Sequence, residues 1–292
     1  MPLRFSKNNP IVWLYAGGIL LLAAGALLWC FKVSMSPERV FWKTIERSLA
    51  TSGVTVQAEQ NSDGTESREM VQYSLGGTNR SHSLTTMSQQ GTTIVNETIG
   101  TPTADYVRYK SINTNQKKAD GSLIDFSKAV GVWAKGTEGS GQFFSQAALG
   151  VTGVLIAGVP SEARAGLVQQ VRDDFVYRID FSKTKKERID GRLVYTYEAS
   201  VQPFAYAKLL KQFAKVVGLQ GLEQLDPEEY KGQKPLNLLI SVDARAHQVA
   251  SLSAPGSASK QTFSAHDIPV RVELPEQTIT GAELQKRINS LQ

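Results

Sequence analysis

The sequence predicts an α+β fold in which an N-terminal transmembrane helix precedes one large antiparallel β-sheet with helices packed on one face. Three observations predict it. Residues 11–31 form an uncharged run. Beyond this run, most segments alternate with the period of two typical of strands, and turns containing Gly or Asn separate them. A few intervening segments show the period of a helix instead. Because strands joined by tight turns pair antiparallel, one sheet with helices on one face follows.

The uncharged run at 11–31 reads IVWLYAGGILLLAAGALLWCF. A helix needs about 20 apolar residues to cross the core of a bilayer, and this run is long enough. Arg4 and Lys7 precede it, and the first acidic residue is Glu38, so the positive-inside rule predicts a cytoplasmic N-terminus. We therefore expect a single-pass signal anchor in the cell membrane. The chain is then divided into a short cytoplasmic tail at 1–10, a transmembrane helix at 11–32 and an extracytoplasmic α+β domain at 33–292.

Two other interpretations of the run stay open. Ala24-Gly25-Ala26 has the small-x-small form of a signal-peptide cleavage site, although the apolar run continues beyond it. The segment ending at Cys30 resembles a bacterial lipobox, but Trp29 occupies the position where a small residue is expected. A cysteine packed within the membrane is the simpler interpretation, so the anchor is favoured over cleavage and over lipidation.

Composition limits the class of protein. The apolar fraction of 41% is ordinary for a globular domain with a real core. Cys30 is the only cysteine, so no disulfide holds the exposed domain, which favours a bacterial protein over a small eukaryotic secreted module. Of the net charge of +5, Arg4, Lys7 and Lys32 belong to the membrane flanks, and 29 basic against 27 acidic residues remain. No long basic stripe is left, so no nucleic-acid partner is expected.

The first predicted element after the anchor is a helix. Ser36-Pro37-Glu38 combines a capping hydroxyl, a proline in the first turn and an acid near the positive helix end. An apolar stripe that includes Phe41 and Leu49 follows, and Gly53 ends the pattern. Because this helix begins only a few residues after the run, we expect the domain to lie close to the membrane.

The strands follow in order along the chain. An antiparallel meander is predicted first, and a second group of strands follows an irregular middle region. Helices are expected at 161–171 and 204–217, and the capping-box pattern at Thr280 and Glu283 predicts a last helix. The predicted strands are 54–60, 66–75, 81–89, 92–99, 104–112, 132–135, 175–181, 192–201, 236–243, 249–253, 261–266 and 270–274.

An uncharged, glycine-containing stretch at 143–159 has two interpretations. It is too short for a second membrane span. In the first interpretation the stretch lines or gates an apolar cavity, and in the second it is a buried core segment. The core interpretation is favoured, because uncharged runs of this length are usually part of a core. The substitutions Leu155→Asp and Ile156→Asp distinguish the two, since only a core segment unfolds the domain when it receives a charge.

Four places in the sequence resemble a known family. Residues 105–109 with 131–134 resemble a strand pair that ends in an aromatic residue, and 195–201 lead into the helix at 204–217. Residues 239–243 and 248–252 form a hairpin pattern, and the helix at Pro37 matches an opening helix. In these places the chain resembles the LolA and LppX/LprG-type periplasmic lipoprotein carriers. The resemblance implies a curved, half-barrel-like sheet whose concave face holds acyl chains. The apparent anchor departs from those lipidated or released carriers, because a tethered domain cannot diffuse across an envelope.

Motifs for chemistry are scarce. His82, His247 and His266 have no ligand spacing to one another, so no metal site is expected. Ser-x-x-Lys occurs at 182–185 and 257–260, both in predicted turns and without the partner motifs of penicillin-binding enzymes. The sequence therefore predicts no catalytic residue, no metal and no cofactor.

The function predicted is that of a single-pass, membrane-anchored extracytoplasmic domain that binds a lipid or other amphiphile in an apolar cavity. The alternative is a structural or adaptor protein of the envelope with a closed core, which binds a protein or cell-wall partner without catalysis. An envelope enzyme is the weakest hypothesis. The residues predicted to line the cavity are Tyr106, Trp133, Phe143, Phe144, Leu155, Ile156, Tyr177, Tyr195 and Tyr197.

Overall fold

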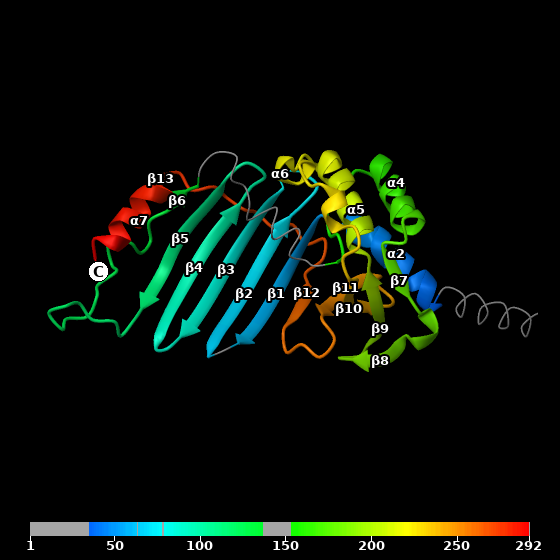
Figure 1. The fold of residues 1–292 in the computed structure, drawn as a ribbon, viewed down its shortest axis with the longest axis horizontal. Coiled ribbons are helices and arrows are strands. Elements are labelled where there is room, and N and C mark those ends of the chain that lie inside the picture. The colour runs from blue at the N-terminus through cyan, green and yellow to red at the C-terminus, as the bar shows by residue number, and fades with distance from the viewer. Residues whose placement is uncertain (1–34, 63, 78, 137–152, 292) are drawn as a thin grey trace, which may run out of the picture.

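A computed structural model describes residues 35–62, 64–77, 79–136 and 153–291. In these residues the chain forms one large, mostly antiparallel sheet, so the predicted α+β class is confirmed. Figure 1 shows that α2, α4 and α5 gather at one end of the sheet, and that α7 lies at the other end. The strands between these two ends carry no described helix in this view.

The strands pair in the order β13-β6-β5-β4-β3-β2-β1-β12-β11-β10-β9-β7, and β8 pairs with β9 outside this path. All pairings are antiparallel except that of β13 with β6. The strands are β1 (Gly53–Ser62), β2 (Thr65–Ser74), β3 (Arg80–Gln89), β4 (Thr92–Gly100), β5 (Asp105–Asn113), β6 (Ala134–Lys135), β7 (Tyr177–Ile179), β8 (Lys185–Ile189), β9 (Arg192–Val201), β10 (Leu236–Asp243), β11 (Gln248–Ser253), β12 (Lys260–Ser264) and β13 (Ile279–Thr280).

The helices have the bounds that their caps and stripes indicate. Pro37 and Pro203 occupy the first turns of α2 and α5, where a missing N–H costs nothing, and Gly218 ends α5 in the left-handed conformation. The helices are α2 (Pro37–Ala50), α4 (Ser161–Asp173), α5 (Pro203–Val217), α6 (Gln220–Glu223) and α7 (Gly281–Asn289), with 3₁₀ turns η1 (Phe181–Lys183) and η2 (Pro227–Tyr230).

The main core lies between the helical end of the sheet and α2, α4 and α5. Its strand side chains come from β1, β2, β7, β9, β10, β11 and β12, and its helix side chains include Phe41, Leu167 and Phe213. A small second cluster contains Ala129, Ala134 and Leu284 and fixes α7 against β6. The predicted capping box is present there, since Thr280 and Glu283 each accept a backbone N–H of the other residue.

The stretch at 153–159 belongs to the main core. Ala157 N donates to Ser48 O at 3.0 Å and Val159 N donates to Leu49 O at 2.8 Å, so the segment satisfies carbonyls at the end of α2. A Cβ added to Gly158 would lie 2.2 Å from the backbone nitrogen of Gly76, so this close approach requires glycine. The described part of the uncharged stretch is therefore a docked core segment.

Two sequence predictions of local structure were wrong. The segment between the predicted strands 175–181 and 192–201 was predicted as a turn, but it contains strand β8, whose sequence KKERI is mostly charged. All residues of β8 are exposed. It is an edge strand that pairs only with β9. The predicted strand at 270–274 is irregular, and Val272 is its buried residue. Pro269 and Pro275 flank this segment and remove backbone donors, which disfavours ladder pairing.

Some predictions fall outside the described residues. The tail at 1–10 and the transmembrane helix at 11–32 lie there, as do Cys30, Phe143 and Phe144. Within the part of the chain that the structure describes, no helix is both long and apolar enough to cross a membrane. The anchor and its orientation therefore stay predictions.

Candidate functional site

The register of the strands assigns every side chain of the sheet to one of two faces. We call the face that packs on α2 the inner face and the opposite one the outer face. Directly paired residues lie on the same face, so a row of partners can be followed across the strands. One inner row runs Phe263, Val56, Val71, Ser83, Thr98, Val107, and the neighbouring outer row runs Thr262, Gln57, Met70, Leu84, Glu97, Arg108.

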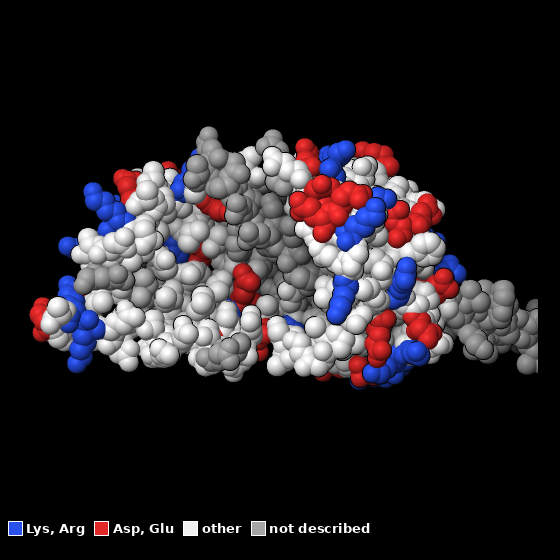
Figure 2. Space-filling view, viewed as in Figure 1, with Lys and Arg blue, Asp and Glu red and all other residues white. Residues whose placement is uncertain are grey.

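The inner face changes character along this row. Beside the helices it is apolar and buried, as Val56 and Phe263 show. Across β3–β5 it carries small and hydroxyl-bearing side chains such as Ser81, Ser83 and Thr98. On β2–β5 the charged residues that the register places on this face are Glu69 and Asp105. In Figure 2 the surface over β3–β5 is largely uncharged, whereas charged side chains gather over α5 and β8.

Hydroxyls and one carboxylate form a small polar cluster on the inner face. Ser83 Oγ donates to Glu69 Oε1 at 3.1 Å, and Thr85 Oγ1 lies 3.5 Å from the same oxygen. Burial raises the pKa of the neighbouring Tyr73 phenol, and the charge of Glu69 raises that pKa further. The Ser81 hydroxyl and the side-chain amide oxygen of Asn96 are buried and have no hydrogen-bond partner among the described residues. The face therefore offers mostly uncharged side chains and two unused polar atoms.

The outer face of the same strands carries an ion-pair cluster. Glu97 is 7% exposed; its carboxylate lies 2.7 Å from His82 Nε2 and accepts a 2.5 Å hydrogen bond from Arg108 Nε. Burial would raise the pKa of this carboxyl, but the hydrogen bonds and charges of His82 and Arg108 together hold it below its usual range. The Arg108 guanidinium stacks 4.6 Å from the centre of the Trp133 ring. These contacts join β3, β4 and β5 on the outer side.

Five of the predicted cavity residues lie in the packed core. They are Leu155, Ile156, Tyr177, Tyr195 and Tyr197. Phe41 of α2 makes edge-to-face contacts with Tyr177 and Tyr197, at centroid distances of 5.6 and 5.3 Å.

The phenol groups of this core hold neighbouring backbone. The hydroxyls of Tyr195 and Tyr197 donate to the carbonyls of Met35 and Pro37, each at 2.9 Å, and that of Tyr177 donates to the Gly153 carbonyl. These side chains fix the start of α2 and the docked core segment. That they also line a ligand cavity stays a prediction.

Two other predicted cavity residues lie elsewhere. Tyr106 pairs with Ile99 on the outer face, and Trp133 stacks there on Arg108. Trp133 also lines a groove with residues 275–279, which lead into β13. The sheet therefore lies between these two aromatic residues and the five core residues. Phe143 and Phe144 are outside the described residues.

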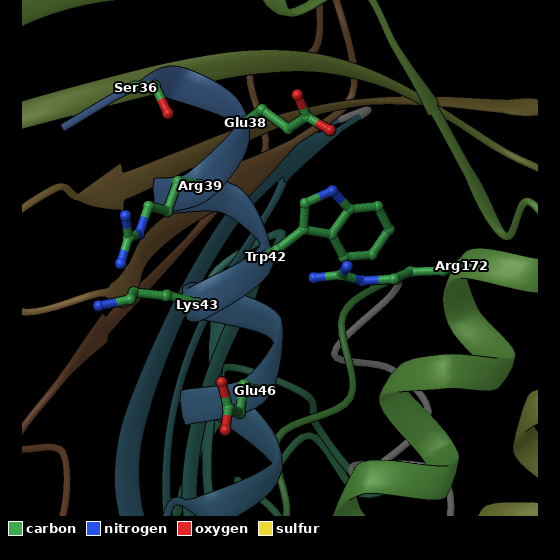
Figure 3. A pocket seen from close by; sticks show the side chains of 7 residues that line it. All are labelled: Ser36, Glu38, Arg39, Trp42, Lys43, Glu46 and Arg172. Carbon is green, nitrogen blue, oxygen red and sulfur yellow. The ribbon is translucent and has the colours of Figure 1, made fainter. Parts of the chain in front are cut away.

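A surface hollow lies beside the first turns of α2. Figure 3 shows that Trp42 and Arg172 of α4 face each other across it, and that Arg39 and Lys43 point to the other side of α2. The Arg172 guanidinium lies 4.5 Å from the centre of the Trp42 ring, which ties α4 to α2. The hollow is lined mainly by charged side chains, so it is unsuited to an acyl chain.

The described residues contain no group of three or more His, Cys, Asp or Glu side chains that could hold a metal ion.

Within the described chain, the site residues that the sequence analysis did not predict are the hydroxyl-bearing ones of the inner face, above all Ser81, Ser83 and Thr98. Their signal was the alternation of β3 and β4, in which His82 and the acidic Glu97 occupy the opposite face.

No family model and no curated protein matches the chain. Among solved structures, the chain is similar to the crystal structure of LprF from Mycobacterium bovis, with 12% sequence identity and a TM-score of 0.39. The match covers 82% of this chain and 96% of that one. A likeness at this level carries no argument, so membership of the LolA and LppX/LprG-type carriers stays a prediction.

Proposed function

We propose that this protein is an envelope binding protein, anchored by residues 11–31, whose extracytoplasmic domain holds the acyl part of an amphiphile along the inner face of β2–β5. The observation that carries the proposal is that the core face continues beyond the helices with mostly uncharged side chains, Glu69 and Asp105 being the charged residues that the register places there. Val71 and Val107 lie on that surface with the small side chains between them. The proposal moves the ligand away from Tyr177, Tyr195 and Tyr197, whose contacts are those of a packed core.

Physical chemistry supports an acyl chain over a charged ligand on this surface. Burying one CH₂ group contributes about 0.8 kcal/mol, so a chain that contacts several strands gains substantial affinity. The hydroxyls of Ser81 and Ser83 suit the polar end of an amphiphile, and Glu69 suits a hydroxyl or amine donor over an anionic group. No step of this proposed function needs catalysis or a cofactor.

Photo-crosslinking tests the proposal on the full chain in its membrane. A palmitic acid with a diazirine in mid-chain is added to membranes, the protein is irradiated, and adducts are mapped by mass spectrometry. Adducts on inner-face residues of β2–β5, such as Val71 and Val107, are expected. Adducts confined to residues 11–31 would contradict binding by the domain and leave only contact between the anchor and the bilayer.

The closed core favours the second candidate, an adaptor without a ligand. Leu155, Ile156 and the three core tyrosines are buried against helices, which is the packing that the adaptor hypothesis expects. The same cross-linking experiment distinguishes the candidates, because an adaptor gives no specific adduct on the domain.

The proposed orientation has its own test. Lys215 is exposed near the end of α5, so a cysteine placed there is accessible to a reagent in solution. The natural cysteine, Cys30, lies within the predicted anchor, where a membrane-impermeant reagent is not expected to reach it. In a Lys215→Cys variant, a membrane-impermeant maleimide should label intact cells as fully as permeabilised cells. Labelling only after permeabilisation would place the domain in the cytoplasm.

A further inference from the structure

A second surface, separate from the inner face, lies beside the last two turns of α2. Lys43, Glu46, Arg47 and Ala50 share one side of the helix because they are spaced by three or four residues. With them the hollow is lined by Arg164 near the start of α4 and by Ala246 and His247 of the β10–β11 turn. Three elements distant in sequence therefore contribute to one site.

The charges of this hollow are unbalanced. Lys43, Arg47 and Arg164 bring three positive charges, and Glu46 is the acid in the lining. Arg47 is paired with Asp267 at 2.6 Å, which leaves its charge largely compensated. Lys43 forms no ion pair with any residue that the structure describes. Glu46 offsets one of the two remaining cations, Lys43 and Arg164, so the lining keeps one net positive charge.

Two buried nitrogens in the lining are unused. Within the described chain, neither Arg164 Nε nor His247 Nδ1 has a hydrogen-bond partner. The Arg164 guanidinium is held in place by a 3.0 Å bond from Nη2 to the Val159 carbonyl. The backbone of His247 is held by its turn, where its N–H donates to Asp243 O at 2.8 Å. Buried polar groups normally have partners, so two unpaired nitrogens at one site indicate an absent acceptor.

The surroundings of His247 show the sign of the local field. Burial lowers the pKa of its ring, the charges of Lys43 and Arg39 lower it further, and Asp243 opposes them. Figure 3 shows Arg39 and Lys43 on the same side of α2. An anion placed there would be stabilised by the same cations that disfavour a proton on the ring.

We propose that this hollow binds a phosphate group, which accepts hydrogen bonds from Lys43 Nζ, Arg164 Nε and the Nδ1–H tautomer of His247. Phosphate oxygens accept several charge-assisted bonds at once, as this arrangement requires. The group is carried either by an anionic phospholipid or by inorganic phosphate. The inference does not depend on acyl binding at the inner face, so either can fail alone.

Calorimetry on the full chain in a neutral detergent tests the site. The probes are inorganic phosphate and dihexanoyl phosphatidylglycerol, at low ionic strength because salt screens exposed charges. We expect saturable binding of at least one probe. Competition between the two identifies one shared site, and saturation by the lipid alone or by phosphate alone identifies the source. Failure of both probes to saturate at about 10 mM would overturn the proposal.

Matched variants locate the binding. Lys43→Gln and Arg164→Gln each remove a charge-assisted bond and should weaken binding by roughly tenfold or more. Lys215→Gln removes an exposed charge of α5 and should leave binding unchanged. Arg164 also donates a hydrogen bond to the Val159 carbonyl, so the melting temperature of Arg164→Gln is first compared with that of the unchanged chain. If Arg164→Gln unfolds, the test rests on Lys43→Gln, because Lys43 is exposed. Equal affinity of Lys43→Gln and the unchanged chain would place the phosphate elsewhere and overturn the proposal.

Discussion

The two halves of the sheet share one inner face but fill it differently. At β9–β12 that face carries side chains such as Ile240 and Val242, which are buried against α2, α4 and α5. At β3 and β4 the same face carries Ser81, Ser83 and Thr98, and no described helix lies over these two strands in Figure 1. The difference teaches that the apolar half packed on the helices stabilises the domain, while the other half carries small and hydroxyl-bearing side chains, of which Ser81 and Ser83 are fully buried.

Leu155→Asp should have the largest effect, because it tests whether the helix-covered half is a closed core. Leu155 is 5% exposed in the main cluster, so an unpaired carboxylate there should cost at least about 4 kcal/mol and unfold the domain. Denaturation of the full chain followed by circular dichroism measures the change. Leu123→Asp is the matched control, since Leu123 is 60% exposed and should change stability by about 0.5 kcal/mol or less. A folded Leu155→Asp variant that loses bound lipid would show that the segment lines a cavity.

Tyr197→Ala should have the next largest effect. The Tyr197 side chain is fully buried between Phe41 and Phe181, and its loss should cost about 3–5 kcal/mol. Tyr197→Phe removes only the bond to the Pro37 carbonyl and should cost about 1 kcal/mol. Urea denaturation of both variants measures the difference. Equal losses in the two would mean that the hydroxyl, and not the packing, stabilises α2.

Glu97→Gln tests the outer face of the half formed by β3–β5. Replacing this buried carboxylate leaves Arg108 and His82 without their charged partner and should cost roughly 1–3 kcal/mol at neutral pH. The folded-state pKa of Glu97 lies below its ordinary value of 4.5. The contribution to stability is therefore complete above that ordinary value and is lost as the pH falls through the folded-state pKa.

Denaturation curves between neutral and acidic pH check this prediction. The unchanged chain should lose more stability on acidification than the Gln variant, because only the former has this carboxylate to protonate. Parallel losses in the two proteins would assign the acid sensitivity to other groups.

Thr280→Ala should have the smallest effect and acts at the end of the sheet where α7 packs. It removes one side of the capping box of α7 and should cost about 1 kcal/mol, while Thr280→Ser keeps the hydroxyl and should cost much less. Hydrogen exchange of the first α7 amides measures both variants. Exchange that is no faster in Thr280→Ala would mean that Leu284 and its packing alone fix the helix.

Much of the fold could be predicted because its local signals are strong. The meander from β1 to β5 and the strand β9 follow from alternation and turn residues, and α7 follows from Thr280 and Glu283. The edge strand β8 has no apolar alternation to detect, since it is exposed on both faces. The irregular run at 270–274 alternates like a strand, but its flanking prolines prevent pairing.

The candidate site could be predicted only in part. Aromatic residues such as Tyr195 and Tyr197 attract attention in a sequence, but alternation does not tell which side of a sheet is covered by helices. Their position in the core depends on α2, whose packing follows from the whole chain. Small residues such as Ser83 and Thr98 carry little signal by themselves. They become a surface only when the register aligns them across β3 and β4.

A matched pair of lysine substitutions on β4 tests the central claim most directly. Thr98 and Thr93 are half-buried threonines of the same strand, and the register places Thr98 on the inner face and Thr93 on the outer face. The yield of diazirine–palmitate adducts on the domain is measured for Thr98→Lys and Thr93→Lys in the full chain. A charge on the inner face should abolish most of the adducts, and the same charge on the outer face should leave them unchanged. Equal yields from the two variants would contradict binding of an acyl chain at the inner face.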